Sequence, residues 1–160
     1  MGIDKSLLNL AGEYRVAAEL LKRGIFAAVT FGNMKGADII ATGPNRRSAV
    51  VEVKASNSSR FVTGLFQKYK TRDCQHPTFW VLCAITPGGE FNTERAFVLT
   101  HDELALKQGQ RNCPGERLSY EQLAARAKKG VDNIRIENIR EFENDWGKIV
   151  AYCLNGQGDR

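Results

Sequence analysis

The sequence predicts a single mixed α/β domain. Three observations support this: a stretch with helical spacing of apolar residues opens the chain, short strand-like runs follow, and helix signals return in the second half. The 160 residues suffice to bury a sizeable core. We expect the domain to span residues 1–154 and residues 155–160 to form a flexible C-terminal tail.

The first helix is expected over Asp4–Arg23, with Asp4 or Ser6 as its N-cap and Gly24 as its stop. Its predicted apolar stripe consists of Leu7, Leu10, Ala11, Tyr14, Ala17, Ala18 and Leu21. The residues predicted to form its solvated face are Gly12, Arg15, Glu19, Lys22 and Arg23. Glu13 falls outside that polar face, at the margin of the apolar stripe, where an ionised carboxylate is costly unless it is paired.

The remaining elements follow from strand-length apolar runs and from turn and capping residues. Residues 61–70 mix aromatic and basic side chains and fit a short helix or an ordered loop. The continuous apolar run 79–85 predicts a buried central strand. Further strands are expected at 25–31, 37–42, 48–55 and 96–100, and further helices at 102–107, 119–129 and within 145–154. Gly109 and Gly130 are expected to end the first two of these helices.

Composition narrows the possible function classes. Twenty-three Lys and Arg against eighteen Asp and Glu give a formal charge of +5, which favours a polyanionic partner. The four cysteines contain no CxxC pair, and a polar stretch follows Met1 in place of an apolar signal core, so we expect a reducing, cytoplasmic location. No stretch approaches the roughly 20 apolar residues of a membrane span, so we expect no membrane partner.

Three acidic residues do not fit a purely structural interpretation. Asp38 opens an apolar strand, and strand alternation places Glu52 and Lys54 on the same face of the next one. Each has a simpler explanation: Asp38 as a turn residue, Glu52 and Lys54 as a solvent-facing ion pair, and Glu13 with its stem packed and its head in water. However, a short turn between the two strands would bring Asp38 and Glu52 to one sheet edge, with the first helix against it.

Such a cluster needs a counter-charge. Two carboxylates about 4 Å apart repel by roughly 4 kcal/mol at an effective dielectric constant near 20. Lys54 alone supplies too little positive charge. An all-oxygen ligand set points to Mg²⁺ or Mn²⁺ rather than to zinc.

These residues resemble a known signature. A helical Glu13, the segment Gly36-Ala37-Asp38 and the tripeptide Glu52-Val53-Lys54 are similar to the motif of the PD-(D/E)XK nuclease superfamily, which includes restriction endonucleases and Holliday junction resolvases. The resemblance covers Gly12 to about Ile85. Ala37 replaces the family's proline, which does no chemistry. The resemblance implies a restriction-endonuclease-like mixed β-sheet core flanked by helices.

The resemblance also implies roles for individual residues. Asp38 and Glu52 would ligate the metal, with the Val53 carbonyl as a further ligand, and Lys54 would position the attacking water. Glu13 would bind the metal directly or through water, or would orient a ligand. Gln67 resembles the extra polar residue that some members carry on the next helix, although its spacing to Tyr69 does not reproduce the longer Gln-to-Tyr motif of the helicase-nuclease branch.

Basic residues close to this motif suggest contacts with nucleic acid. Lys35 and Arg60 flank the predicted site in sequence, and Lys68, Lys70 and Arg72 form a basic run. Such side chains bind phosphates, although a run of this kind is also typical of a solvated face. Of the three nearby aromatic residues that could stack on bases, we expect at least two to pack in the core: Phe61, Phe66 and Tyr69.

Other chemistries are disfavoured. A zinc site built from Cys74, His76, Cys83 and His101 fails on spacing, because Cys83 lies inside a continuous strand. Neither histidine has a serine or cysteine nucleophile arranged with it, so a catalytic triad is not supported.

The sequence therefore favours a Mg²⁺-dependent (or Mn²⁺-dependent) nuclease that hydrolyses DNA phosphodiester bonds, of the endonuclease or junction resolvase type. Cutting two strands symmetrically needs two sites, so a homodimer fits this hypothesis. The main alternative is a nuclease-fold module that binds nucleic acid or protein without cutting. A nuclease directed at RNA is a third possibility.

Overall fold

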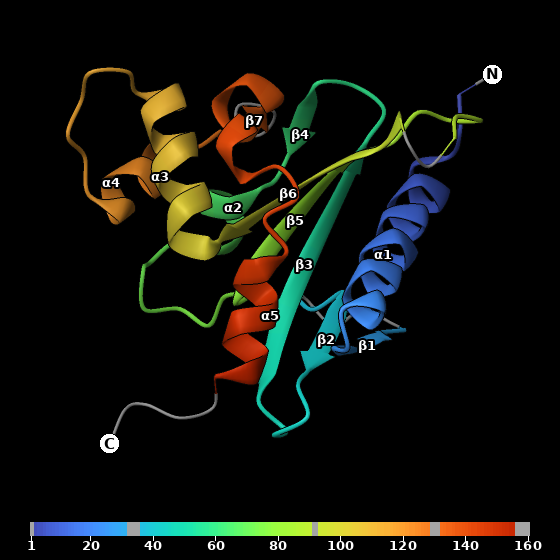
Figure 1. Ribbon diagram of the computed structural model, residues 1–160. Coiled ribbons are helices and arrows are strands. Elements are labelled where there is room, and N and C mark those ends of the chain that lie inside the picture. The colour runs from blue at the N-terminus through green and yellow to red at the C-terminus, as the bar shows by residue number, and fades with distance from the viewer. Residues whose placement is uncertain (1, 32–35, 91–92, 129–131, 156–160) are drawn as a thin grey trace.

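A five-stranded mixed β-sheet lies at the centre of the structure, with helices on both sides of it (Figure 1). The structure is a computed structural model and describes residues 2–31, 36–90, 93–128 and 132–155. The mixed α/β class predicted from the sequence is confirmed. Predictions for residues 156–160 lie outside the described residues, and Asn155 is exposed.

The sheet has the strand order β1-β2-β3-β5-β6. The first three strands form an antiparallel meander, β5 pairs with β3 in parallel, and β6 pairs with β5 in antiparallel orientation. Two further short strands, β4 and β7, form a separate antiparallel pair. The strand bounds are β1 Phe26–Val29, β2 Ile39–Thr42, β3 Ser48–Ser56, β4 Arg60–Val62, β5 Phe79–Ala84, β6 Arg95–Thr100 and β7 Asn133–Arg135.

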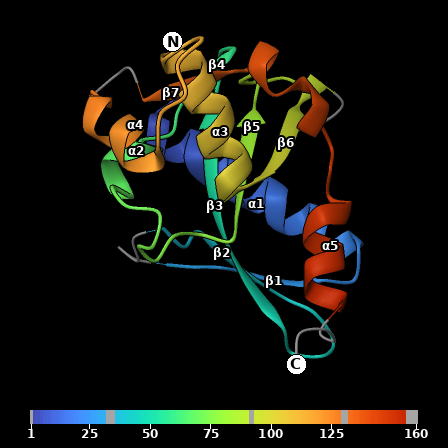
Figure 2. The same cartoon turned by 90° about the vertical axis from the view of Figure 1, so that its left-hand side faces the viewer.

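Two apolar clusters form the core, one on each side of the sheet. Alternation along β3 and β5 sends Val51 and Val81 into the first cluster and Trp80 into the second. The first cluster receives residues of α1 (Lys5–Lys22) and α5 (Gly147–Leu154). The second is covered by α2 (Leu65–Lys68), α3 (His101–Asn112) and α4 (Tyr120–Arg126), with 3₁₀ turns at Ile136–Asn138 and Arg140–Phe142. Figure 2 shows α3 in front of β3 and β5, with α1 behind them.

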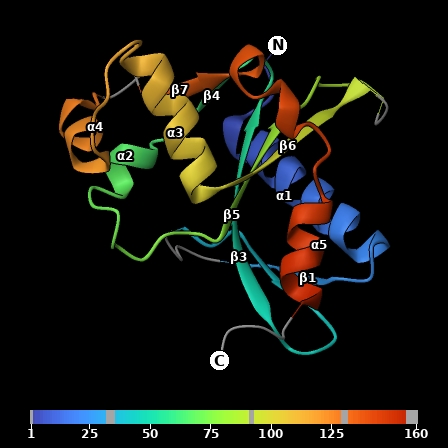
Figure 3. The same cartoon turned by 60° about the vertical axis from the view of Figure 1, so that its left-hand side comes forward.

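The last helix closes the fold against the hairpin between β2 and β3 (Figure 3). The Asn45 side chain donates a hydrogen bond to the Leu154 carbonyl oxygen at 2.9 Å. Gly43 lies so close to α5 that an added Cβ would stand 2.1 Å from the Cys153 carbonyl oxygen. Glycine is therefore required at this position because no side chain fits between the turn and the helix.

The predicted faces of α1 are wrong. Leu7, Tyr14 and Leu21 are more than half exposed, whereas Gly12 and Glu19, assigned to the solvated face, are buried. Glu19 tolerates burial because it accepts hydrogen bonds from three basic neighbours, Arg15, Lys22 and Arg23. These contacts lower the pKa of Glu19 to about 2, although burial alone would raise it. The helix therefore packs through Leu8, Gly12, Val16 and Leu20.

Two other expectations needed correction. Gly109 does not end a helix: it lies inside α3, which runs on to Asn112. A Cβ there would stand 2.6 Å from Leu123 Cδ1, so the missing side chain lets α4 approach α3 closely. The strand pair β4–β7 was not predicted, because each strand has only three residues and the pairing joins distant segments. The run at 79–85 is a buried internal strand as expected, with β3 in the middle of the sheet.

No helix of the described residues is long and apolar enough to cross a membrane. All four cysteines are free thiols. Cys83 is buried within β5, so it behaves as a small core side chain, as the sequence indicates.

His101 is a buried polar anchor in the second cluster. The Trp80 indole N–H donates to His101 Nδ1 at 3.2 Å, and His101 Nε2 lies 3.0 Å from the Tyr120 hydroxyl. That hydroxyl donates to the Tyr69 carbonyl oxygen at 2.7 Å. Because Nδ1 must accept and Nε2 must donate, the contacts fix a neutral ring. Burial lowers the pKa of His101 to about 4.

We expect this histidine to make the fold sensitive to acid. Its stabilising effect is complete above about pH 6.5, where the unfolded histidine is also neutral, and is lost as the pH falls towards 4. The loss should reach about 3 kcal/mol of unfolding free energy. Urea unfolding of the wild type and of His101→Gln between pH 4 and 8 measures it. Parallel pH profiles for the two proteins would contradict the assignment.

Candidate active site

The sheet leaves part of one strand edge open. Strand β2 begins at Ile39, which pairs with Val51, while β3 continues to Ser56. Peptide groups of β3 beyond Val51 therefore have no β2 partner on that side. Side chains take the place of the missing strand: Asp38 Oδ2 accepts from the Val53 N–H at 2.7 Å, and Asn9 Oδ1 accepts from the Ala55 N–H at 3.4 Å.

Asp38 is fixed beside the strand that carries Glu52 and Lys54. Its own N–H donates to the Val51 carbonyl oxygen at 3.0 Å, so both its backbone and its side chain are bonded to β3. In a strand, the N–H and C=O of one residue point to the same side, which places the Val53 carbonyl at this open edge as well. The structure thus brings Asp38 and the predicted Val53 ligand together.

The position of Glu13 follows from close packing of α1 on β3. A Cβ at Gly12 would stand 3.0 Å from Ala55 Cβ and 3.4 Å from Val53 Cγ1, so the glycine allows the helix to approach the strand. The next residue, Glu13, is half-buried. Burial raises the pKa of Glu13, and the negative charge of Asp38 raises it further. The charges of Glu13 and Asp38 therefore act on each other.

Glu52 is the most buried of the three predicted acids, Glu13, Asp38 and Glu52, with 1% of its surface exposed. Its Oε1 lies 2.9 Å from Lys54 Nζ and 2.5 Å from Lys68 Nζ. Its Oε2 accepts a hydrogen bond from the Tyr69 hydroxyl at 3.0 Å. Both oxygens are thus satisfied, as a buried carboxylate requires.

Charge compensation sets the protonation states of the site. Burial alone would raise the pKa of Glu52, but the Lys54 charge and the Lys68 hydrogen bond outweigh it and leave the pKa lowered. Burial alone would lower the pKa of Lys54, but the Glu52 charge outweighs it and leaves the pKa raised. The pKa of Asp38 is raised, because burial outweighs the Val53 N–H bond and the Lys54 charge. Glu52 is therefore ionised and Lys54 protonated, while Asp38 and Glu13 are undercompensated.

A buried polar network holds α2, the source of Lys68 and Tyr69. Asp132 Oδ2 accepts from the Gln67 N–H at 3.0 Å, and the Thr63 hydroxyl accepts from the Leu65 N–H at 3.2 Å. Gln108 of α3 joins the two, because it accepts from Thr63 at 2.7 Å and donates to Asp132. Asp132 was missed in the sequence because only long-range folding brings it to α2.

The remaining residues predicted for catalysis or nucleic-acid contact do not all lie beside the acids. Lys68, predicted to contact nucleic acid, is bonded to Glu52. The Gln67 side chain is exposed and makes no hydrogen bond to the acids among the described residues; the neighbouring Tyr69 does so instead. Lys70 is exposed, and Arg72 lies 3.6 Å from Asp102. Lys35 lies outside the described residues, and Arg60 opens β4.

Phe61, Phe66 and Tyr69 are all buried, which confirms core packing for at least two of them. No pattern in the sequence indicates directly that Tyr69 reaches Glu52. The only available signal was its position shortly after the Glu52-Val53-Lys54 motif.

The oxygen atoms at this site can be compared with the ligands that a divalent cation requires. Within the described part of the chain, no three Asp, Glu, His or Cys side chains lie together closely enough to hold an ion. Mg²⁺ does not require such a cage, because it commonly uses one or two carboxylates with water and substrate phosphate. Asp38, Glu52 and the Val53 carbonyl supply only hard oxygen atoms, and burial raises the pKa of Asp38 although the charges of Lys54 and Lys68 act to lower it. The residues fit Mg²⁺ or Mn²⁺ on these grounds.

Comparisons of the chain with models of protein families, with curated proteins and with solved structures gave no match. The chemistry assigned to this site therefore rests on its own geometry and charges.

The Tyr69 hydroxyl should contribute to stability through Glu52. Removing it in Tyr69→Phe keeps the ring but leaves a buried carboxylate oxygen without its donor, which we expect to cost about 1.5–3 kcal/mol. Tyr152→Phe is the matched control, since the described structure shows no hydrogen bond for that hydroxyl. Urea unfolding at pH 7 measures both variants. Equal losses in the two would contradict the role of the Tyr69–Glu52 contact.

Proposed function

We propose that this protein is a metal-dependent nuclease that hydrolyses DNA phosphodiester bonds, with a restriction-endonuclease-like fold. One observation carries the proposal: Asp38, before β2, bonds the Val53 N–H between Glu52 and Lys54 of β3, and Glu13 of α1 lies within the electrostatic influence of Asp38 and Lys54. The central mixed sheet between helices agrees with the fold that the motif resemblance implies. The formal charge of +5 favours a polyanionic substrate.

In this proposal, Asp38, Glu52 and the Val53 carbonyl hold Mg²⁺ or Mn²⁺, and Glu13 contacts it through water. When bound, the ion stabilises the negative charge that develops on the phosphoryl oxygens. Glu52, which is bonded to Lys54 and Lys68, would share an oxygen atom with the ion. Lys68 would then be available to contact a phosphate, which would reconcile its present ion pair with its predicted role.

Lys54 orients the attacking water rather than deprotonating it. Its raised pKa keeps the ammonium group charged, so Lys54 donates hydrogen bonds and compensates developing negative charge. Proton transfer then requires another group on the chain. Glu13 suits this step, because a carboxylate with a raised pKa is a better proton acceptor than an ordinary one.

A binding module without catalysis remains the second candidate, and one observation favours it. Lys54 and Lys68 already neutralise Glu52 without a metal ion, as in a purely structural buried ion pair. Such a module needs neither divalent cation nor water activation. The two candidates therefore differ in metal binding as well as in cleavage.

Asp38→Ala and Lys54→Ala should each lower Mg²⁺-dependent cleavage of DNA by roughly 10²–10⁴-fold, because Asp38 is the proposed metal ligand and Lys54 the group proposed to orient the attacking water. Nicking of supercoiled plasmid and of branched and linear duplexes measures this. An exposed carboxylate outside the site provides the control, Glu137→Ala, which should cleave like the wild type. The same residual activity in all four proteins would reject the nuclease proposal.

Metal affinity should respond in opposite directions to two substitutions. Asp38→Asn should abolish Mg²⁺ or Mn²⁺ binding, since it removes a charged ligand. Lys68→Met should strengthen binding by about tenfold, because it removes a competing positive charge from Glu52. Isothermal titration calorimetry with each metal measures both effects. No heat of binding in any of the proteins, including the wild type, would favour the binding module.

A further inference from the structure

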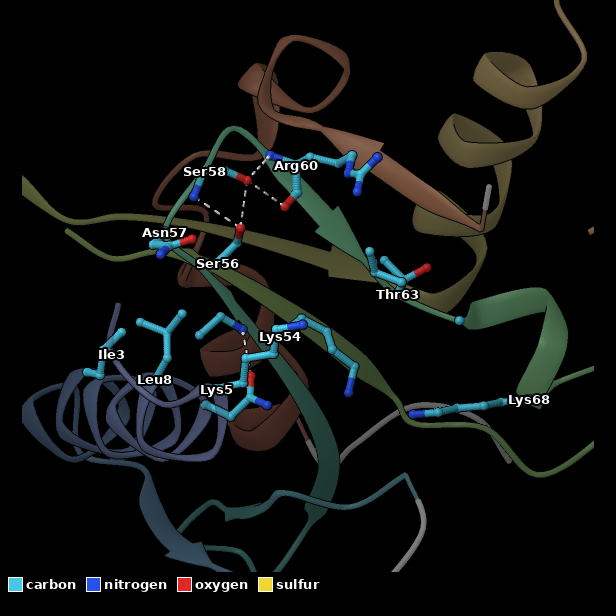
Figure 4. Close-up of a pocket in the computed structure, with 14 residues that line it drawn as sticks. Ile3, Lys5, Leu8, Lys54, Ser56, Asn57, Ser58, Arg60, Thr63 and Lys68 are labelled. Atoms are coloured by element: carbon cyan, nitrogen blue, oxygen red, sulfur yellow. Dashed lines mark hydrogen bonds between the residues drawn. The ribbon is translucent and has the colours of Figure 1, made fainter. Parts of the chain in front are cut away.

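A groove beside the candidate site has walls from four elements (Figure 4). It encloses about 560 Å³ between the start of α1, the end of β3, the segment leading into β4 and the start of α2. Lys54 and Lys68, both bonded to Glu52, line it, so the groove begins at the acidic cluster. Its far side is lined by Lys5 and Arg60.

The charged residues described along this groove are all positive. Four of its lining residues are cationic, namely Lys5, Lys54, Arg60 and Lys68, and no Asp or Glu is among them. Lys54 and Lys68 are compensated by Glu52, whereas no ion pair or hydrogen bond of the Lys5 or Arg60 side chain appears in the described part of the chain. The groove thus offers two uncompensated cations on the side away from the acids.

Strand pairing concentrates positive charge next to the groove. Arg60 of β4 lies directly opposite Arg135 of β7, and both are exposed. Like charges directly opposite each other in such a pair destabilise a sheet. Arg111 is also close: burial and the charges of Arg135 and Arg60 lower its pKa, and the negative charge of Glu137 offsets this only in part. The repulsion between these close arginines would be relieved by a bound anion, so the surface suits anion binding.

The neutral lining also suits a sugar–phosphate backbone. Hydroxyl and amide groups come from Ser56, Asn57, Ser58 and Asn9. Ser56 and Ser58 are ordered by a hydrogen bond of 3.1 Å between their hydroxyls, and the Ser58 hydroxyl accepts from the Arg60 N–H at 3.3 Å. None of the described residues that line the groove is aromatic, so these residues offer no platform on which bases could stack.

We propose that this groove binds the phosphate backbone of the DNA next to the bond being cut, with Lys5 and Arg60 as its phosphate contacts. The inference rests on the proposed function, which it extends by naming a strand path and a mode of recognition. The DNA runs from the acidic cluster across the end of β3 towards the start of α1. Because phosphate contacts carry no sequence information, binding through this groove is independent of sequence.

The test measures binding without cleavage. A fluorescent DNA duplex is titrated with wild-type protein, Lys5→Gln, Arg60→Gln and the double variant in EDTA, across a series of salt concentrations. Each substitution should lower the slope of log K against log salt by about 0.9, and the double variant by about twice that. Arg117→Gln, which changes an exposed arginine near the start of α4, is the control and should keep the wild-type slope. Melting temperatures establish that every variant is folded.

The outcomes separate this inference from the proposed function. Wild-type slopes for both groove variants, or no binding by the wild type, would overturn the groove assignment, even if Asp38-dependent cleavage is observed. Reduced slopes without any cleavage would support the groove and reject the nuclease. Two duplexes of unrelated sequence should show equal losses, and a loss confined to one of them would contradict backbone recognition.

Discussion

The compensation of the buried Glu52 carboxylate is the constraint on which the rest of the structure depends. An ionised carboxylate with 1% of its surface exposed would be strongly destabilising without donors around it. Lys54 comes from the same strand face, but Lys68 and Tyr69 reach Glu52 only because α2 is held by Asp132, Thr63 and Gln108. Residues from both halves of the chain therefore cooperate to stabilise a single charged group.

Elements from both sides of the sheet contribute to the site. Glu13 comes from α1 on one side, and Lys68 and Tyr69 come from α2 and its C-cap on the other. Asp38 and Asn9 can bond to β3 because β2 is short and leaves the end of β3 without a neighbouring strand on that side. Charge is unevenly distributed around this opening. The Glu52 carboxylate is compensated by Lys54 and Lys68, whereas the negative charges of Asp38 and Glu13 repel each other. The neighbouring groove carries the cations Lys5 and Arg60, for which the described structure shows no ion pair. Such an imbalance is typical of sites that bind charged ligands.

The sequence predicted the parts of this arrangement that depend on local periodicity. Two-residue alternation correctly placed Glu52 and Lys54 on one face, and the short connection between strands brought Asp38 beside them. The orientation of α1 could not be predicted in the same way. Its apolar residues cover more than one side, and Glu19 is buried only because three basic side chains compensate it, so a pattern of polarity alone selects the wrong face. The roles of Tyr69 and Asp132 were also out of reach, since both arise from contacts between distant segments.

The side-chain caps on β3 have one more consequence. An unpaired stretch of strand is a template on which another chain can add, and proteins normally guard such stretches against aggregation. Here Asp38 and Asn9 occupy the N–H groups of Val53 and Ala55 that an incoming strand would use. Asp38, to which we assign metal binding in the proposed function, thus also shields the strand edge, and replacing it would leave the Val53 N–H open to an incoming strand.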